Sequence, residues 1–174
     1  MVNWTMVAGL ILPNVGGWLG ALTMAGQVKR PDGKAWYQLL KKPSWNPPSW
    51  VFGPAWTALY TGMGYASYLV LKTSGGFTQQ ALIPLSLYGG QLLLNWTWSP
   101  VFFRFHQIKL AFFHMLALDA AAAACTISFM FANRTAGYLM LPYLAWLGFA
   151  TCLNYTIWQL NKDGISEKDK AILT

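Results

Sequence analysis

Residues 43–71 read PSWNPPSWVFGPAWTALYTGMGYASYLVL, without a single Asp, Glu, Lys or Arg. Residues 1–28, 73–103 and 135–161 are equally free of these residue types, and residues 110–133 contain only Asp119. Each run is at least as long as the roughly 20 residues that an α-helix needs to cross the hydrocarbon core of a bilayer. The sequence therefore predicts several membrane-spanning helices.

The composition of the whole chain excludes the other common classes of protein. Of the 174 residues, 55% are hydrophobic and only 10% are charged, and the mean hydropathy is +0.35. Soluble domains carry about 25% charged residues, and disordered chains combine low hydrophobicity with high charge. The strands of a membrane barrel would alternate apolar and polar residues, whereas these runs are continuously apolar. An integral membrane protein of the all-α class remains.

The charge-free runs predict a bundle of five transmembrane helices that forms a single domain over residues 1–174. The connections are short, so successive helices are expected to run antiparallel. The first span lacks a basic leader and a small-residue cleavage site, which predicts a retained helix. The five expected spans are Thr5–Ala25, Trp50–Leu71, Ala81–Phe103, Ala111–Phe131 and Tyr138–Leu160.

The basic residues predict the orientation of this bundle. Lys72 and Arg134 fall on one side of the membrane, and the other ten of the twelve Lys and Arg residues fall on the opposite side. Cytosolic loops carry the excess of positive charge, so the first loop and the C-terminus are expected in the cytosol. The net charge of +7 is then interpreted as a ring of basic residues that contacts anionic lipid head groups on the cytosolic side. The expected partner is therefore the bilayer, and no nucleic acid is expected to bind. The ten residues are Lys29, Arg30, Lys34, Lys41, Lys42, Arg104, Lys109, Lys162, Lys168 and Lys170.

Two polar and aromatic stripes are expected to face the interior of the bundle, because amide groups in hydrocarbon need partners. In one interpretation, the amides link helices through hydrogen bonds and the Trp residues anchor the bundle at the membrane interface. The other makes the stripes the wall of an apolar ligand pocket. Trp18, Trp56, Trp96 and Trp146 lie within spans, which interfacial anchoring does not explain. The stripes are Tyr88, Gln91, Asn95 and Trp98 on the third span, and Tyr143, Trp146, Ala150 and Asn154 on the fifth.

A row of small residues on the first span predicts close packing against protein. Gly16 and Gly20 stand four residues apart, and Gly9 and Pro13 continue the row. Small residues at this spacing let a second helix approach closely. The partner helix is expected either within the bundle or across a dimer.

Catalytic and metal-binding motifs are missing from the sequence. It contains no Walker loop, GxGxxG, GxSxG or HExxH, so neither a cofactor nor a metal is expected. Cys125 and Cys152 are expected to be buried free thiols, and His106 an interfacial residue. Asp119, inside a span, is expected to face inward and to be hydrogen-bonded or protonated.

Three motifs carry a resemblance to a known family. Residues 42–56 read KPSWNPPSWVFGPAW, residues 94–103 read LNWTWSPVFF, and residues 141–146 read LPYLAW. Together they resemble the translocator protein family, also called tryptophan-rich sensory proteins or peripheral-type benzodiazepine receptors. The resemblance extends from Pro13 to Trp158, and the run GGFT at residues 75–78 is similar to animal members.

The resemblance implies a five-helix bundle, often a homodimer, that binds porphyrins, cholesterol-like sterols and aromatic drugs beneath the first loop. Trp56 and Trp146 match tryptophans that the resemblance connects with light-dependent porphyrin breakdown. Leu153 and Tyr155 match the sterol motif, although Gln159 follows them and the first basic residue is Lys162. The implied ligand-binding residues are Ala21, Met24, Trp50, Phe52, Gly53, Ala55, Trp98, Leu110, Phe113, Ala117, Trp146, Ala150 and Leu153.

Two positions depart from the family pattern. Leu110 stands where animal members commonly have Trp, and His114 stands where the family usually has a carboxylate. These departures leave drug affinity open and also fit a divergent paralogue.

The expected function is the binding of porphyrins and sterol-like lipophiles, and a further hypothesis is a transporter that moves its ligand between leaflets. The alternative is a light- or oxidant-dependent porphyrin-degrading enzyme that uses Trp56 and Trp146. The resemblance implies the mitochondrial outer membrane with a cytosolic C-terminus, and the alternatives are the endoplasmic reticulum and the plasma membrane. The glycosylation sequon at Asn133 would lie away from the cytosol, whereas the sequon at Asn95 lies within a span.

Overall fold

The computed structural model describes residues 3–24, 26–28 and 35–163. Every regular element in these ranges is helical, in agreement with the all-α prediction. The elements are α1 (Trp4–Thr23), α2 (Trp36–Leu39), α3 (Ser49–Thr73), α4 (Gln79–Ser99), the π-helix η1 (Pro100–Arg104), α5 (Ile108–Ala132) and α6 (Arg134–Leu160).

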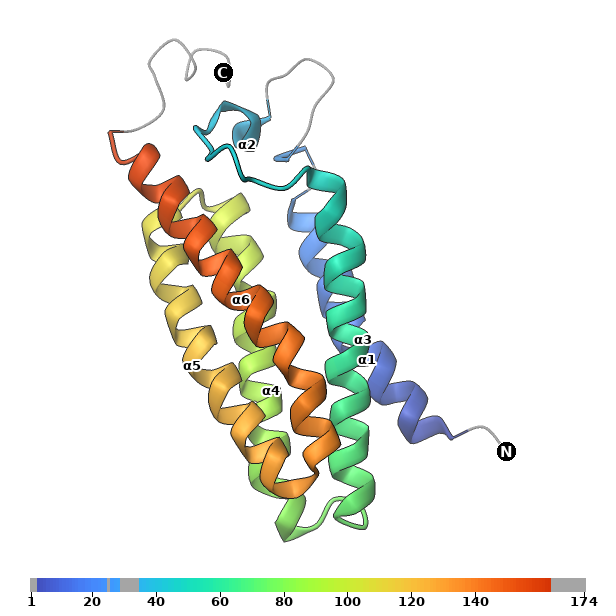
Figure 1. Ribbon diagram of the computed structural model, residues 1–174. Coiled ribbons are helices and arrows are strands. Elements are labelled where there is room, and N and C mark those ends of the chain that lie inside the picture. The colour runs from blue at the N-terminus through green and yellow to red at the C-terminus, as the bar shows by residue number, and fades with distance from the viewer. Residues whose placement is uncertain (1–2, 25, 29–34, 164–174) are drawn as a thin grey trace.

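The five longer helices form one bundle, and the short helix α2 lies across one end of it (Figure 1). Among the described residues, three helices are long and apolar enough to cross a membrane, and these segments are Trp4–Leu22, Ile108–Ala132 and Arg134–Leu160. The helices α3 and α4 have 25 and 21 residues, but Trp, Tyr, Gly and amide residues lower their hydropathy. The chain is thus an all-helical membrane protein, and the five predicted spans are not all confirmed.

The turn between α5 and α6 is much shorter than the sequence predicts. The predicted spans leave residues 132–137 between them, whereas the helices extend beyond these spans and only Asn133 separates α5 from α6. The Asn133 side chain accepts a hydrogen bond from Ala136 N at 3.0 Å and donates one to Thr73 Oγ1 at 2.8 Å. At Gly137 any Cβ would overlap Met130. Glycine therefore lets the two helices approach closely enough for a single capping residue to connect them.

The glycine row of α1 packs within the bundle, as one of the two predicted alternatives requires. Gly9 lies against the backbone of Gly64, and Gly16 lies against the indole of Trp96, where a Cβ would overlap the ring. Trp96 also donates a hydrogen bond to the carbonyl oxygen of Pro13 at 3.3 Å. The prediction of close packing is confirmed for this face. The homodimer stays a prediction, and it would need another surface.

The chain changes from α-helix to π-helix at Pro100. Proline has no N–H and disturbs the regular hydrogen-bond pattern of a helix. Phe105 N here donates to the carbonyl oxygen of Pro100 at 3.0 Å, which is the wider i to i+5 spacing of a π-helix. Phe102 and Phe103 are buried as a result, and they form the base on which α2 rests.

We call residues 35–48 the cap. Trp36, Tyr37 and Leu40 of the cap are buried against Phe102 and Phe103. Tyr37 N donates a hydrogen bond to the carbonyl oxygen of Gln27 at 2.8 Å, which ties the cap to the end of α1. The cap therefore closes one end of the bundle with an aromatic layer.

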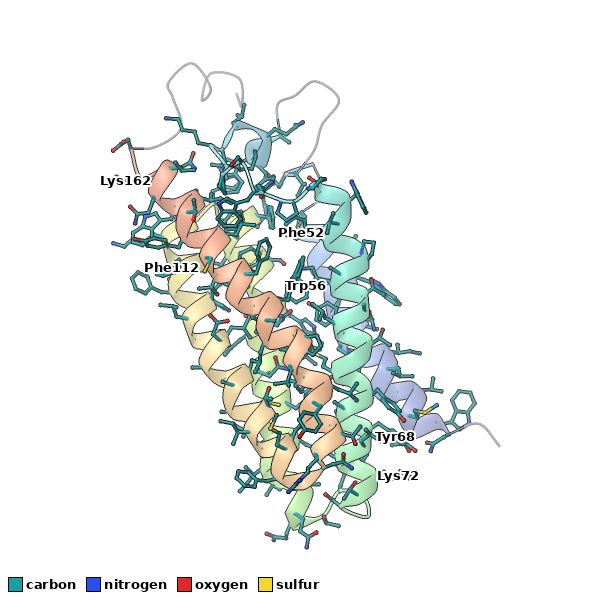
Figure 2. All side chains as sticks on the ribbon, viewed as in Figure 1. Phe52, Trp56, Tyr68, Lys72, Phe112 and Lys162 are labelled. Carbon is teal, nitrogen blue, oxygen red and sulfur yellow. The ribbon has the colours of Figure 1, made fainter. Side chains whose placement is uncertain are left out.

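The described basic residues segregate to the two ends of the bundle. Lys72 and Lys162 lie at opposite ends in Figure 2, and the hydrogen bond from Asn133 to Thr73 brings Arg134 to the end that carries Lys72. Five of the ten basic residues predicted for the cytosolic side lie outside the described residues, namely Lys29, Arg30, Lys34, Lys168 and Lys170. The others belong to the cap or to helix ends near it, namely Lys41, Lys42, Arg104, Lys109 and Lys162.

Candidate functional site

A cavity of about 460 Å³ lies beneath the cap, between the five long helices. Phe52 and Trp56 project from α3 toward α6 at its level (Figure 2). Its described lining residues include no Asp, Glu, Lys, Arg or His. They are Asn14, Gly17, Trp18, Ala21, Met24, Val28, Tyr37, Ser49, Phe52, Gly53, Trp56, Thr57, Tyr60, Asn95, Trp98, Ser99, Phe102, Phe103, Met115, Leu118, Trp146, Ala150, Leu153, Asn154 and Ile157.

Eight of the thirteen predicted ligand-binding residues line this cavity. They come from four different helices, so the fold brings together positions that are far apart in the sequence. Trp56, the other residue of the degradation hypothesis, also lines it. The eight are Ala21, Met24, Phe52, Gly53, Trp98, Trp146, Ala150 and Leu153.

The structure does not bring the other five to the cavity. Trp50, Leu110 and Phe113 are 74%, 56% and 50% exposed, and Ala55 and Ala117 lie outside the lining. On α5 it is Met115 and Leu118 that face inward instead. Tyr155 of the sterol motif is likewise turned outward.

The difference on α5 between the predicted residues and those that line the cavity has a physical cause. The Ala, Leu, Phe and Met residues of α5 are spread over all sides of the helix, so its sequence does not indicate which face is buried. Without an apolar stripe, helical periodicity cannot predict the inward face. The resemblance supplied positions 110, 113 and 117, and the interior is lined by residues one or two positions further along.

Aromatic rings form one wall of the cavity. The rings of Phe52 and Trp146 lie 5.9 Å apart between centroids and cross at 72°, and those of Trp56 and Trp146 lie 6.4 Å apart at 86°. Trp98 stacks on Phe102 at 5.0 Å and donates its indole N–H to the carbonyl oxygen of Ala111 at 3.1 Å. Edge-to-face and stacked pairs of this kind stabilise the wall and keep flat surfaces available to a ligand.

A chain of buried hydrogen bonds forms the floor. Tyr60 OH donates to Asn95 Oδ1, Asn95 Nδ2 donates to Tyr143 OH at 3.0 Å, and Tyr143 OH donates to Gln91 Oε1 at 2.7 Å. The predicted stripes thus face inward, and their amides link helices as the first interpretation requires. Asn95 and Tyr60 also border the cavity, so the pocket interpretation fits the same residues. Tyr60 was missed, although it lies one helical turn after Trp56.

Tyr37 forms part of the roof. Its hydroxyl donates to Asn46 Oδ1 at 3.1 Å, and Lys42 Nζ donates to its carbonyl oxygen at 2.6 Å while lying 4.6 Å from the centre of its ring. Burial raises the pKa of Tyr37, an effect that the bond to Asn46 partly offsets, and burial lowers the pKa of Lys42. Lys42 is not among the residues that line the cavity, so its cation adds no charge to the described lining.

The remaining reactive side chains lie away from the cavity. Asp119 is half-buried and accepts a hydrogen bond from Thr151 at 2.7 Å, as expected, and His114 Nε2 lies 2.8 Å from the carbonyl oxygen of Leu94. Both cysteines are free, but only Cys125 is buried. The prediction for Cys152 is wrong because its side of α6 faces outward. The described lining therefore offers apolar packing and neutral hydrogen bonds rather than acid–base chemistry.

Comparison with known proteins gives a consistent result. The model of the TspO/MBR family matches residues 9–159. Translocator protein of Homo sapiens is 46% identical over 159 residues, covering 91% of each chain. Translocator protein 2 of Canis lupus familiaris is 41% identical over 125 residues, 71% of this chain and 73% of that protein. The tryptophan-rich sensory protein of Cereibacter sphaeroides is 39% identical over 142 residues, 82% of this chain and 85% of that protein.

Proposed function

The chain belongs to the TspO/MBR family, and from this premise we propose that its cavity binds flat lipophilic molecules, namely porphyrins, cholesterol-like sterols and aromatic drugs. One observation carries the proposal. An aromatic cavity of about 460 Å³, whose described lining has no charged side chain, lies at the centre of the bundle. This volume falls within the roughly 300–1,000 Å³ of small-molecule pockets, which are mostly apolar with a few polar groups.

The proposal places all five long helices across the membrane. The helices α3 and α4 run alongside α5 and α6 (Figure 1), and residues 43–71 and 73–103 are free of charge. Their polar side chains are largely turned inward, since Gln91, Asn95 and Tyr60 are buried and bonded to one another or to Tyr143. The hydropathy of α3 and α4 is low because of polar side chains that face the interior of the bundle. Such helices can still span the membrane, because these side chains do not contact lipid.

Intrinsic fluorescence tests the site. Protein purified in detergent or nanodiscs is titrated with protoporphyrin IX dimethyl ester and, separately, with a fluorescent sterol. Trp98 and Trp146 line the cavity and present large flat surfaces, so the double Phe variant should show weaker quenching and weaker binding. The matched control is Trp50→Phe, which changes an exposed tryptophan outside the lining. Unchanged quenching and affinity in the double variant would show that the ligand binds outside this cavity.

A second candidate function is light- or oxidant-dependent degradation of porphyrin. The observation that favours it is the perpendicular pair of Trp56 and Trp146 on the cavity wall, together with Tyr60, whose ring centre lies 5.3 Å from that of Trp56. Illumination of bound porphyrin in the presence of dioxygen separates the two functions. An enzyme consumes more than one porphyrin per protein molecule, and Trp56→Phe and Trp146→Phe should stop it. A binding protein returns its porphyrin unchanged.

We also propose that the capped end of the bundle faces the cytosol, in the mitochondrial outer membrane. Five described basic residues at the capped end and two at the other support this orientation through the charge asymmetry of membrane proteins. The sequon at Asn133 no longer discriminates between compartments, because its side chain caps α6 and bonds to Thr73. Protease protection of a C-terminal tag in intact mitochondria is the sharper test. A tag that the protease cannot reach would show that the C-terminus faces away from the cytosol, opposite to the proposed orientation.

A further inference from the structure

The cavity is open on one side. Five of its lining residues are also exposed, and they occupy two neighbouring helices: Trp18 and Ala21 on α1, and Ser49, Gly53 and Thr57 on α3. Trp18 is 60% exposed. The lining residues of α5 and α6 are all buried or half-buried, namely Met115, Leu118, Trp146, Ala150, Leu153, Asn154 and Ile157.

The α3 edge of this opening is built from small side chains. Ser49, Gly53 and Thr57 recur every four residues, so they share one face of the helix. A Cβ added at Gly53 would meet nothing within 4 Å, and the Thr57 hydroxyl bends back to the carbonyl oxygen of Gly53 at 3.0 Å. Among the described residues, no large side chain of α3 therefore closes the gap at this edge, and Trp18 stands at it from the side of α1.

The capped end offers no comparable opening among the described residues. Trp36, Tyr37, Leu40 and Phe102 are buried there in one aromatic layer. Asn161 fixes this layer to α6 through two hydrogen bonds with the backbone of Lys41, at 3.0 Å and 2.8 Å. Water and the cavity are thus separated by packed side chains over the described part of the cap.

The depth of the gap decides which phase it faces. Thr57 lies two helical turns beyond Trp50, the first residue of the second expected span, so it sits roughly 10 Å along the helix from that end. In the proposed five-span topology this depth is within the hydrocarbon core, which is about 30 Å thick. The opening thus extends from Ser49, just outside the expected span, to Thr57 in the hydrocarbon core, and a molecule that passes through its deeper part comes from the lipid phase.

We infer that ligands enter and leave the cavity sideways, from the bilayer, through a slit between α1 and α3 that is edged by Gly53 and Thr57 and gated by Trp18. The inference rests on the proposed function and narrows its ligand class. The molecules that use the slit are dissolved in the hydrocarbon and carry no charge on the part that passes, because the described lining has no charged partner to receive one. A sterol, or a porphyrin whose carboxylates are esterified or stay outside, meets this requirement.

Binding kinetics in nanodiscs test the inference with protoporphyrin IX dimethyl ester as the probe. Gly53→Leu fills the open space at the slit, and it should slow association by about tenfold and dissociation with it, because a gate acts in both directions, whereas the loss of a ligand contact would act on dissociation alone. Trp18→Ala widens the mouth and should speed both rates. The matched control is Gly148→Leu, since Gly148 is an exposed helical glycine on α6 with equally open surroundings and no part in the lining.

A cap variant distinguishes the two routes. Asn161 itself lies neither at the slit nor in the lining, so Asn161→Ala acts on entry only by loosening the cap, and by the lateral route association should stay as fast as in the unmodified protein. Faster rates in Asn161→Ala together with unchanged rates in Gly53→Leu would overturn the lateral route and place entry at the cap. A change in dissociation alone in Gly53→Leu would make Gly53 a contact rather than a gate, which also overturns the inference. If the unmodified protein binds none of the probe, the proposed function itself fails.

Discussion

The side-chain amide of Asn161 pairs with the backbone of Lys41, 120 residues earlier in the chain. Lys41 N donates to Asn161 Oδ1 at 3.0 Å, and Asn161 Nδ2 donates to the carbonyl oxygen of Lys41 at 2.8 Å. One residue at the end of α6 thus satisfies both backbone groups of a residue in the cap. The roof of the cavity is held to the bundle at this point, since Tyr37 of the same cap lines the cavity.

Removing this pair should loosen the cap. Asn161→Ala removes both hydrogen bonds to the backbone of Lys41, which is exposed so that water can replace them, and we expect a loss of about 0.5–1.5 kcal/mol per bond in the local stability of the cap. Hydrogen exchange of residues 35–48 measures this directly. The control is Thr156→Ala, because the Thr156 hydroxyl only bonds to the carbonyl oxygen of Cys152 within α6. Equal protection of the cap in both variants would show that Asn161 does not hold it.

The glycine row of α1 should tolerate no side chain at Gly16. A Cβ there would overlap the indole of Trp96, so Gly16→Ala should cost roughly 1–3 kcal/mol through strain and displacement of the ring. Gly148→Ala is the matched control, since nothing lies within 4 Å of its added Cβ and helix propensity alone favours alanine. Thermal unfolding in detergent compares the two. A Gly16→Ala protein as stable as Gly148→Ala would mean that α1 and α4 pack less closely than described.

The residues of the hydrogen-bonded floor should be energetically coupled, so that their substitutions do not lower the stability additively. Asn95→Leu removes the acceptor of Tyr60 and the donor to Tyr143, and the buried Tyr60 hydroxyl left without its partner costs about 1–3 kcal/mol, whereas Tyr143 still donates to Gln91. Tyr60→Phe in the same protein should add little, because its partner is already gone. A double-mutant cycle measures this coupling, with exposed Tyr65→Phe on the same helix as the control. Additive losses would contradict the network.

The pH dependence of the cap should follow His106. Its ring stacks on Trp36 at 4.2 Å, and its Nε2 lies 3.2 Å from Gln27 Oε1. Burial lowers the pKa of His106 below 6.5, the charge of Arg104 lowers it further, and a bond with the backbone of Phe103 partly offsets both. The unfolded state therefore binds the proton more readily, so the contribution of His106 is complete above pH 6.5 and is lost as the pH falls through the lowered pKa.

Hydrogen exchange of the cap at about pH 7.5 and about pH 5.5 checks this dependence on His106. The unmodified protein should lose some protection at the lower pH, by a modest amount because the ring is exposed. His106→Asn is the control, since asparagine tolerates the positive φ of 56° at this position and does not titrate. A cap that loosens equally in His106→Asn would assign the pH dependence to another group.

The sequence predicted those features whose cause lies in local pattern. The spacing of Gln91 and Asn95 predicted an inward stripe, and the spacing of Gly9, Gly16 and Gly20 predicted close packing, because each face of these helices is chemically distinct. Features that depend on contacts between distant segments were missed. The one-residue turn at Asn133 requires the approach of Gly137 to Met130, and the folding of the cap over the bundle requires the π-helix to present Phe102.

The residues that line the cavity also fall into those that the sequence could predict and those that it could not. Trp146 belongs to a predicted polar and aromatic stripe and lines the cavity, and Phe52 and Gly53, which the resemblance implied, line it as well. The helix α5 is apolar on every side, so neither Met115 nor Leu118 could be distinguished from its neighbours by pattern. Tyr37 could not be placed from sequence, since its position in the roof depends on the path of the cap.

Filling the cavity tests the central claim most directly. Ala150 lies on the cavity wall, whereas Gly148 lies on the outward face of the same helix with open space around it. The equilibrium Kd for protoporphyrin IX dimethyl ester is measured for Ala150→Trp and Gly148→Trp in nanodiscs, with thermal unfolding confirming that both are folded. The account predicts that Ala150→Trp weakens binding by about tenfold or more, equivalent to about 1.4 kcal/mol, while Gly148→Trp binds as the unmodified protein does. Equal and undiminished affinity in both variants would contradict it.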